Sequence, residues 1–207
     1  MRVRASSVNP VDAYLAGGVL KGMVEHEFPV VLGRDYAGVV EQAGSAVTGY
    51  AVGDEVFGFP PHGSPAVHDG TWAELILVSQ DRSVARRPAS AAAAAAGAAP
   101  LAAITALAAH DALDLDKGAT VLVVGASGGV GSFAVQLAAA GAAGEGPGRT
   151  NVGAAPTTEN LERLAGLLED GTLSVPIQAS YPLAQVDQAV KDLAGQHTQG
   201  KLAVTLP

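Results

Sequence analysis

The feature that most constrains this chain is a glycine-rich turn between an apolar run and a helical pattern. Residues 120–124 are β-branched or leucine, which predicts a strand buried on both faces. Glycines follow at 125, 128, 129 and 131, and the residues that then recur with helical spacing are Val130, Ala134, Leu137 and Ala138. A strand, a glycine turn and a helix in this order bring backbone N–H groups to a pyrophosphate at the start of the helix.

The spacing of the turn matches the dinucleotide-binding pattern G-x-G-x-x-G except at its first position. Ala126 takes the place of the first glycine, and Gly128 and Gly131 take the other two. Gly128 permits a tight turn, while the missing side chains at Gly129 and Gly131 let a phosphate or a neighbouring strand approach. Ser127 can donate its hydroxyl to phosphate. The alternative is a tight turn with a structural role only.

The composition excludes several classes of binding partner and of catalytic or metal site. A chain of 207 residues allows one or two domains, and with only 4% aromatic residues its core must consist of alanine, valine and leucine. With 12 basic and 20 acidic residues the net charge is −8, which argues against nucleic-acid and anionic-membrane partners. The sequence has no cysteine, which excludes disulfides, thiol nucleophiles and thiolate zinc sites.

The sequence predicts neither a secretion signal nor a membrane span. Residues 1–4 lack the apolar segment of a signal peptide. The most apolar window, 89–109, is mostly alanine and is interrupted by Gly97 and Pro100. We therefore expect a cytoplasmic protein.

Short strands separated by glycine turns dominate the first part of the chain. Alternation predicts a strand over 2–8, and Asp12 is the expected cap of a short helix that ends at Gly17. Other strands are expected at 28–33, 37–41 and 71–78, and residues 52–58 are expected to form a turn that enters another strand. Together they indicate a small all-β barrel or sandwich.

Helices and two further strands are expected after this β region. Ser90 is the expected cap of an alanine helix that Pro100 breaks, with a second helix over 101–113. A flexible segment is expected at 140–148. Thr157 or Thr158 then caps a helix whose apolar face comprises Leu161, Leu164, Leu167 and Leu168. The remaining expected elements are a strand at 175–179, a helix, and a closing strand at 200–204. The apolar face of that helix comprises Val186, Ala189, Val190 and Leu193.

In this order, the segments resemble the zinc-independent, quinone oxidoreductase-like branch of the medium-chain dehydrogenases/reductases. The residues that carry the resemblance are 5–12, 29–40 with Gly33, Asp35 and Gly38, 52–56, 70–74, 100–106, the glycine turn, 183–193 and 200–204. The resemblance implies an α/β protein with a GroES-like β-barrel domain at 1–100 and a truncated Rossmann-type NADP-binding domain at 101–180. It implies that residues 181–207 form a helix and a strand that return to the core.

The resemblance also implies hydride transfer from NADPH to a quinone or an α,β-unsaturated carbonyl compound. Asn9 and Tyr14 match positions beside the nicotinamide and substrate, where an amide N–H or phenol O–H donates to the substrate oxygen. The residues expected to bind the cofactor are Thr105, Ser127, Gly128, Gly129, Val130, Gly131 and Lys201. The structural alternatives are a turn role for Asn9, packing for Tyr14 and Thr105, and a solvated charge for Lys201.

No metal site is expected. The zinc-dependent branch has histidine where Arg34 follows Gly33, together with cysteine ligands, and this sequence has neither. Its five histidines show no metal-ligand spacing, so we expect each of them to be a solvated or loop residue.

The expected cofactor domain is short. Two βαβαβ halves need about 90 residues, whereas residues 118–157 supply 40. The second strand, whose end would bind the adenosine ribose or its 2′-phosphate, is missing, and so is a lead-in strand of the β domain. Three interpretations follow: an internally deleted enzyme, a pseudoenzyme whose β domain binds a small molecule or a protein, or a homodimer that completes the sheet.

Overall fold

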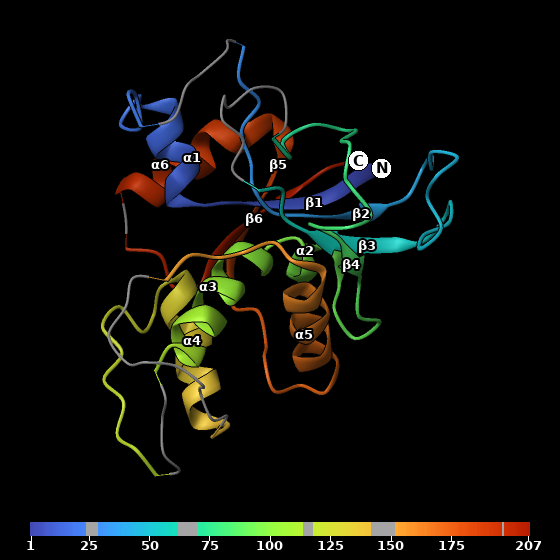
Figure 1. Ribbon diagram of the computed structural model, residues 1–207. Helices are drawn as coiled ribbons and strands as arrows, with labels where there is room; N and C mark the ends of the chain where they lie inside the picture. Colours follow the sequence, from blue (N-terminus) through green and yellow to red (C-terminus); the bar gives the residue numbers. More distant parts are fainter. Residues whose placement is uncertain (24–28, 62–69, 114–117, 142–151, 196) are drawn as a thin grey trace.

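The structure is a computed structural model that describes residues 1–23, 29–61, 70–113, 118–141, 152–195 and 197–207. The described residues form a six-stranded sheet in the order β4-β3-β2-β1-β6-β5 (Figure 1). Its strands are β1 (Arg2–Val8), β2 (Tyr36–Val39), β3 (Glu55–Gly58), β4 (Ala85–Arg86), β5 (Ile177–Pro182) and β6 (Lys201–Thr205). Neighbours pair antiparallel except β5 and β6, which pair in parallel. The first and last strands, β1 and β6, are adjacent, and neither lies at an edge of the sheet.

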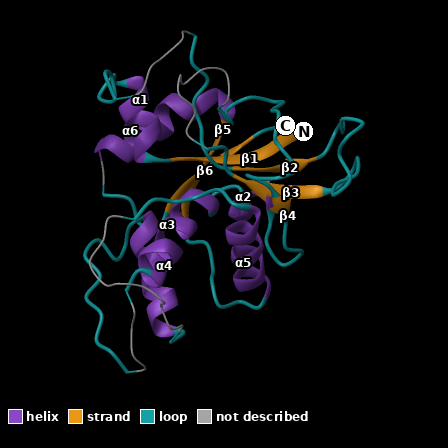
Figure 2. Ribbon diagram, in the orientation of Figure 1, coloured by secondary structure: helices purple, strands orange, loops and turns teal. Residues whose placement is uncertain are grey.

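Helices cover both faces of this sheet. They are α1 (Pro10–Ala16), α2 (Ala93–Ala96), α3 (Pro100–Asp111), α4 (Gly129–Ala139), α5 (Thr158–Glu169) and α6 (Val186–Gly195), with a 3-10 turn η1 (Leu183–Gln185) before α6. Helices α1 and α6 lie on one side, and α2 to α5 lie on the other (Figure 2). None of the described helices is long and apolar enough to cross a membrane.

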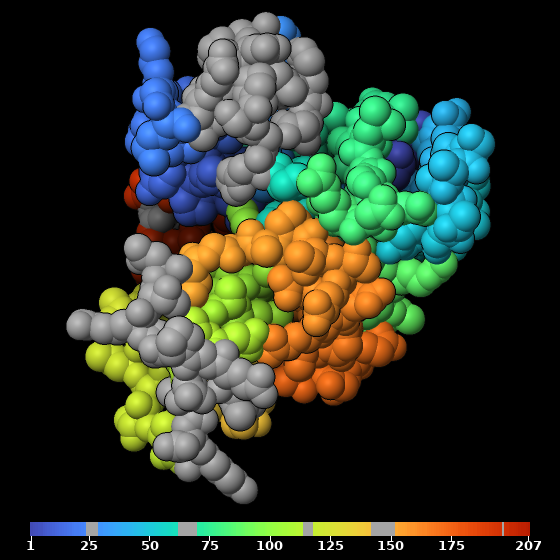
Figure 3. Space-filling view, in the orientation of Figure 1, coloured from blue at the N-terminus to red at the C-terminus, as the bar shows by residue number. Residues whose placement is uncertain are grey.

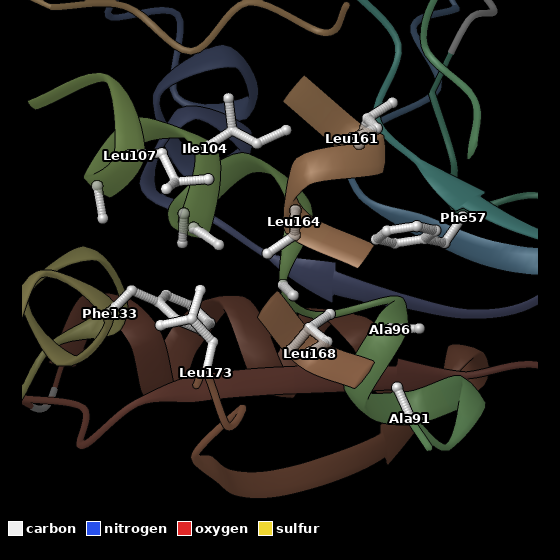
Figure 4. Close-up of a cluster of buried hydrophobic side chains, with 14 of the residues drawn as sticks. Phe57, Ala91, Ala96, Ile104, Leu107, Phe133, Leu161, Leu164, Leu168 and Leu173 are labelled. Carbon is white, nitrogen blue, oxygen red and sulfur yellow. The ribbon is translucent and has the colours of Figure 1, made fainter. Parts of the chain in front are cut away.

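Small and aliphatic side chains build the core, as the composition predicts. One buried cluster joins α2, α3, α4 and α5 to the sheet, and Figure 4 shows Ile104, Phe133 and Leu164 among its members. A second cluster on the other face includes Val3, Tyr36 and Leu202. Both clusters contain strand residues, so the sheet separates two cores.

Several elements confirm the sequence predictions. Strand β1, helix α1, strand β3, helix α6 and strand β6 lie close to their expected positions. The side chain of Thr157 accepts a hydrogen bond from Asn160 N and caps α5, which buries Leu161, Leu164 and Leu168. At α1 the cap is Asn9 rather than Asp12. The Asp12 carboxylate instead accepts from the Asn9 backbone N–H at 2.8 Å, which stabilises the same helix start.

The buried strand predicted at 120–124 does not form. Its Leu122 and Val124 side chains are 87% and 89% exposed, and the yellow-green atoms of this part of the chain lie at the surface in Figure 3. A strand needs a hydrogen-bonded neighbour, and no described residue pairs with 120–124. The helix that follows is present, and of its predicted stripe it buries Leu137, together with Phe133, while Val130 is exposed.

Other local predictions were also wrong. The described part of 28–33 and residues 71–78 contact each other and β1 irregularly, for example through Trp72 N and Leu32 O at 2.9 Å, and form no named strand. Ser90 does not cap a helix, because its hydroxyl donates to Glu169 at 2.9 Å. The predicted break of the alanine run is confirmed, since α2 ends before Pro100 and α3, close to the expected 101–113, begins at Pro100, where its missing N–H needs no partner.

The expected solvated state of the histidines is wrong for His110, which is 5% exposed on α3. His197 is exposed, and His26, His62 and His68 lie outside the described residues. Most of the segment expected to be flexible at 140–148 is also outside them. Strand β5 crosses the expected domain boundary at 180, and the boundaries themselves stay a prediction.

Candidate functional site

A cleft of about 430 Å³ separates the start of α4 from the sheet. One wall contains the glycine turn, and the other contains the end of β1 and the start of β6. The predicted site residues that line it are Asn9, Gly128, Gly129, Val130, Gly131 and Lys201. The structure therefore brings together residues from the two ends of the chain and from its middle.

The adjacency of β1 and β6 puts Lys201 beside Asn9. Val8 is opposite Leu202 in the antiparallel register, so the residue after β1 meets the first residue of β6. Gly200 precedes that residue with a φ of +85°, and a Cβ there would lie 2.1 Å from Pro176 O. Only glycine fits this approach, which fixes where β6 begins.

The glycine turn is closed by its own backbone. Gly125 has a φ of +76°, and its carbonyl accepts from Gly128 N at 3.0 Å. A Cβ on Gly131 would lie 2.1 Å from Gly125 O, so the turn itself requires this glycine. A Cβ on Gly129 would lie 3.1 Å from Lys201 Cδ, so this glycine permits the approach of β6. Gly200 N donates to Ser127 O at 2.7 Å and ties the turn to the start of β6.

Lys201 lies in a buried polar cluster rather than in solvent. Its side chain is 4% exposed, and Nζ donates to Asn9 Oδ1 at 2.5 Å. Asn9 Nδ2 donates to Asp35 Oδ2 at 2.8 Å, and that oxygen lies 3.6 Å from Lys201 Nζ. The structural alternative of a solvated charge is therefore wrong for Lys201. For Asn9, the turn role and the site position coexist, since it caps α1 and also holds Lys201.

Two carboxyl groups set the electrostatics of this cluster. Burial raises the pKa of Asp12 to about 6, against the lowering effect of N–H donors from Asn9 and Gly33. Burial lowers the pKa of Lys201, and the nearby Asp35 and Asp12 oppose that shift. One buried ammonium is thus shared between two carboxyl groups.

Three predicted site residues lie elsewhere than in the lining of the cleft. Tyr14 is 51% exposed on α1. Thr105 donates its hydroxyl to Leu101 O of its own helix at 2.6 Å. Ser127 lies on the turn, but its hydroxyl is 2.9 Å from His197 Nε2. Their roles toward substrate or cofactor stay predictions.

Sequence reasoning missed Asp35 and Ser7 as members of the site. Both side chains are buried, and Ser7 Oγ donates to Asp35 Oδ2 at 2.5 Å. A signal for Asp35 was present, because it lies between the apolar runs 28–32 and 37–40. A carboxylate in such a setting is rarely buried unless it is paired. In the part of the chain that the structure describes, no group of three or more histidine, cysteine, aspartate and glutamate side chains is arranged to hold a metal ion.

Two family models match the chain. The alcohol dehydrogenase GroES-like domain matches residues 1–89, and the model described as zinc-binding dehydrogenase matches residues 73–204. Among curated proteins, the chain is 36% identical over 182 residues to the chloroplastic quinone-oxidoreductase homolog of Spinacia oleracea, covering 84% of this chain and 51% of that protein. It is 32% identical over 205 residues to the 2-methylene-furan-3-one reductase of Solanum lycopersicum, covering 95% and 49%. It is 36% identical over 157 residues to the mitochondrial NAD(P)H oxidoreductase RTN4IP1 of Homo sapiens, covering 66% and 38%.

Solved structures share the fold. The quinone oxidoreductase of Coxiella burnetii superposes with a TM-score of 0.86 at 21% identity, over 100% of this chain and 89% of that one. An alcohol dehydrogenase superfamily protein of Novosphingobium aromaticivorans gives 0.84 at 22%, over 100% and 91%. The chain spans about half the length or less of the curated relatives named above. With its GroES-like and partial Rossmann-like parts, the chain belongs to the medium-chain dehydrogenase/reductase superfamily, in the quinone oxidoreductase-like branch.

Proposed function

We propose that this chain is an NADPH-dependent reductase that acts on quinones or α,β-unsaturated carbonyl compounds and needs no zinc. The observation that carries the proposal is the cleft in which the glycine turn at the start of α4 faces the Asn9–Lys201 pair. The family supports the reaction class, because the relatives include a quinone-oxidoreductase homolog and an NAD(P)H oxidoreductase. Arg34 in place of a histidine, and the absence of cysteine, support the zinc-free chemistry.

The glycine turn fits the phosphates of a dinucleotide. The first N–H groups of a helix have no partner inside the helix, and they carry the positive end of the helix dipole. Gly128, Gly129 and Gly131 line the cleft and have no side chains to cover these groups. We assign the turn and the first residues of α4 to hold the pyrophosphate. NADPH, when bound, supplies the hydride.

On the opposite wall we assign Lys201 to the substrate oxygen. Asn9 Nδ2 has two N–H groups, and its acceptors are Asp35 and Ser7. Lys201 has three N–H donors; Asn9 Oδ1 accepts one, and Asp35 Oδ2 lies 3.6 Å away. The remaining donor can stabilise the negative charge that develops on a carbonyl or quinone oxygen and can release a proton to it. Asn9 then holds Lys201, and Tyr14→Phe tests the role predicted for that phenol.

A second candidate is a binding module that has lost the reaction. The observation that favours it is the exposure of Leu122 and Val124, because a Rossmann-type domain normally buries this run in a parallel sheet. Residues 118–141 and 152–176 contain no named strand, so the described cofactor part has no sheet of its own. A small molecule or a protein would then bind the GroES-like part, and a homodimer would be one way to cover the exposed run.

An NADPH titration of the purified chain separates the two candidates. Trp72 is a suitable fluorescent reporter because its Nε1 donates to Ser7 O at 3.1 Å, next to the polar cluster. Calorimetry should give the same dissociation constant as the fluorescence. Saturable binding supports the reductase and justifies assays with quinones and enones. Absence of binding by a protein that melts cooperatively supports the binding module.

Gly128→Asp tests the assignment of the turn. Gly128 is the cap of α4 with φ −77° and ψ 177°, a backbone that aspartate favours, and a Cβ added there would meet Gly125 O only at 3.4 Å. The variant should therefore fold at least as well as the natural chain, while its charge weakens NADPH binding about tenfold or more. Gly128→Asn is the matched control, since it caps equally and adds no charge. Equal NADPH affinity in the Asp and Asn variants would show that the phosphates bind elsewhere.

A further inference from the structure

One buried carboxylate joins the segments that form the cleft. Asp35 lies directly before β2 and is fully buried. Its Oδ1 accepts from Leu101 N at the start of α3, at 2.7 Å. Its Oδ2 accepts from Asn9 Nδ2 at 2.8 Å and from Ser7 Oγ at 2.5 Å, and lies 3.6 Å from Lys201 Nζ. Asp35 therefore contacts β1, the cap of α1, the start of α3 and the start of β6, and it does not line the cleft.

The bonds of Asp35 explain why an ionised group is tolerated there. The N-cap position before α3 is Ala99, whose side chain cannot accept a hydrogen bond, and Asp35 supplies the acceptor from a distant part of the chain. The positive end of the helix and the Lys201 ammonium both stabilise the negative charge. Leu101 N, Asn9 Nδ2 and Ser7 Oγ all donate to its two oxygens, so Asp35 acts as a hydrogen-bond acceptor in this site.

This acceptor character decides how the Asn9 amide is turned. A carboxylate cannot donate, so it requires the Nδ2 end of the amide to face it. The Oδ1 end must then point away from Asp35, and that oxygen is the one that accepts from Lys201 Nζ at 2.5 Å. An amide turned the other way would place its oxygen against Asp35 and its nitrogen against the ammonium, which is repulsive at both ends.

We propose that Asp35 is the positioning residue of this site, which fixes the Asn9 amide so that its oxygen holds the Lys201 ammonium beside the cleft. The inference deepens the proposed reductase function and rests on it. It goes beyond a cap of α3, because capping uses Oδ1 alone, whereas positioning uses the bonds to Oδ2.

Asp35→Asn is the decisive substitution because it keeps the shape and removes the charge. We expect kcat to fall about 100-fold, the loss typical of a reacting group displaced by about 1 Å. NADPH affinity, measured by Trp72 fluorescence, should stay within about threefold, because the phosphate site is unchanged. Two-dimensional NMR of the Asn9 side-chain amide, assigned with Asn9→Asp, should show both Nδ2 protons shifted. This NMR readout requires no turnover.

The pH profile gives a further readout. Asp35 from the loop before β2 and Asp12 from α1 both raise the pKa of Lys201, and α4 meets Lys201 at the uncharged Gly129. Asp35→Asn removes one of these two charges, so Lys201 loses its proton at a lower pH. The alkaline limb of the kcat–pH profile should therefore move to lower pH, by as much as the pKa of Lys201 falls. A limb that stays in place would contradict the electrostatic link between Asp35 and Lys201.

Tyr36→Phe is the matched control for lost stability. Tyr36 is the next residue, is equally buried, and donates to Ser83 O away from the cleft. It should lower the melting temperature and leave kcat and the pH profile unchanged. If Asp35→Asn behaves like Tyr36→Phe, with normal kcat and normal Asn9 amide signals, the positioning role is refuted. If Asp35→Asn fails to fold, Asn9→Leu breaks the same link while Asp35 still caps α3, and a normal kcat in that variant would equally refute it.

Failure of the Asp35 proposal can be distinguished from failure of the proposed reductase function. A natural chain that neither binds NADPH nor turns over would refute the reductase. The Asn9 amide signals would still report whether Asp35 orients this side chain.

Discussion

Gly131→Ala probes the contact that closes the glycine turn. The added Cβ would lie 2.1 Å from Gly125 O, 2.7 Å from Gly125 C and 2.8 Å from Ala126 Cα, where ordinary contacts begin at 3.4 Å. The neighbouring atoms are backbone, so the turn must move by roughly 1 Å or more. Gly125 O also accepts from Gly128 N, so this movement strains a hydrogen bond.

The magnitude follows from three opposing contributions. Forced overlap in a packed region costs about 1–3 kcal/mol, and a lost hydrogen bond costs about 1 kcal/mol. Alanine in place of glycine inside a helix returns about 1 kcal/mol. We therefore expect Gly131→Ala to lower the free energy of unfolding by about 1–3 kcal/mol.

Gly166→Ala supplies the matched control. It is the same substitution in α5, at an exposed position where a Cβ would meet nothing within 4 Å. This variant should gain up to about 1 kcal/mol from helix propensity alone. Urea unfolding of both variants, compared at equal m-values, isolates the contact with Gly125. Equal stability of the two variants would refute the closed geometry of the turn, and with it the reason why glycine is required at 131.

Three further predictions follow from burial and charge. The pKa of Asp12 is about 6 in the folded chain against a usual value of 3.8, so the folded state binds this proton more tightly. The free energy of unfolding should therefore fall by about 3 kcal/mol as the pH rises from about 3.8 to about 6. Urea unfolding of Asp12→Asn at several pH values should lack this decrease, and the same decrease in both proteins would contradict the prediction. His110 has no hydrogen-bond partner for either ring nitrogen among the described residues, so His110→Leu should leave the melting temperature unchanged or raise it, whereas a marked fall would reveal an unseen bond. Leu122→Ser, at a side chain that is 87% exposed, should lower the free energy of unfolding by less than about 0.5 kcal/mol. Leu137→Ala, at a side chain that is 1% exposed, should lower it by about 2–5 kcal/mol. A large loss of stability in Leu122→Ser would mean that residues 120–124 are buried.

Elements with strong local signals could be predicted from the sequence. Helix α5 has a capping threonine, a leucine stripe and a terminal glycine, and each of these acts within one or two turns of chain. Strand β1 alternates, and α6 carries an apolar stripe. These features depend on neighbours in sequence, so the sequence is sufficient for them.

The run 120–124 shows where local reasoning fails. Its composition is that of a buried strand, but burial comes from neighbouring strands and helices rather than from the run itself. The short cofactor region predicted that such neighbours are missing, and the exposure of Leu122 and Val124 is the consequence. The apolar composition of 120–124 predicts burial, whereas the short length of the cofactor region predicts that no strands are there to bury it. The structure agrees with the prediction based on length.

The candidate site could be predicted residue by residue but not as an arrangement. Asn9 and Lys201 are 192 positions apart, and their hydrogen bond depends on the pairing of β1 with β6. No spacing in the sequence encodes that pairing. Asp35 could have been suspected as a buried charge, yet its four partners come from β1, the cap of α1, α3 and β6, so its role emerges only from the tertiary structure.

The two walls of the cleft have different supports, and this difference bears on function. Asn9 and Lys201 are held by β1 and β6, which are paired strands inside the sheet. Among the described residues, no strand leads into the glycine turn. It is held by the bond from Gly200 N to Ser127 O and by α4, whose Phe133 and Leu137 are buried in the core with α3 and α5. A phosphate site needs the helix start to be fixed, and the core packing of α4 can do this where a parallel sheet normally would. The described residues between α4 and β5 form no strand that could supply the expected adenosine contacts, whereas the packing of α4 fixes the helix start at the proposed pyrophosphate site.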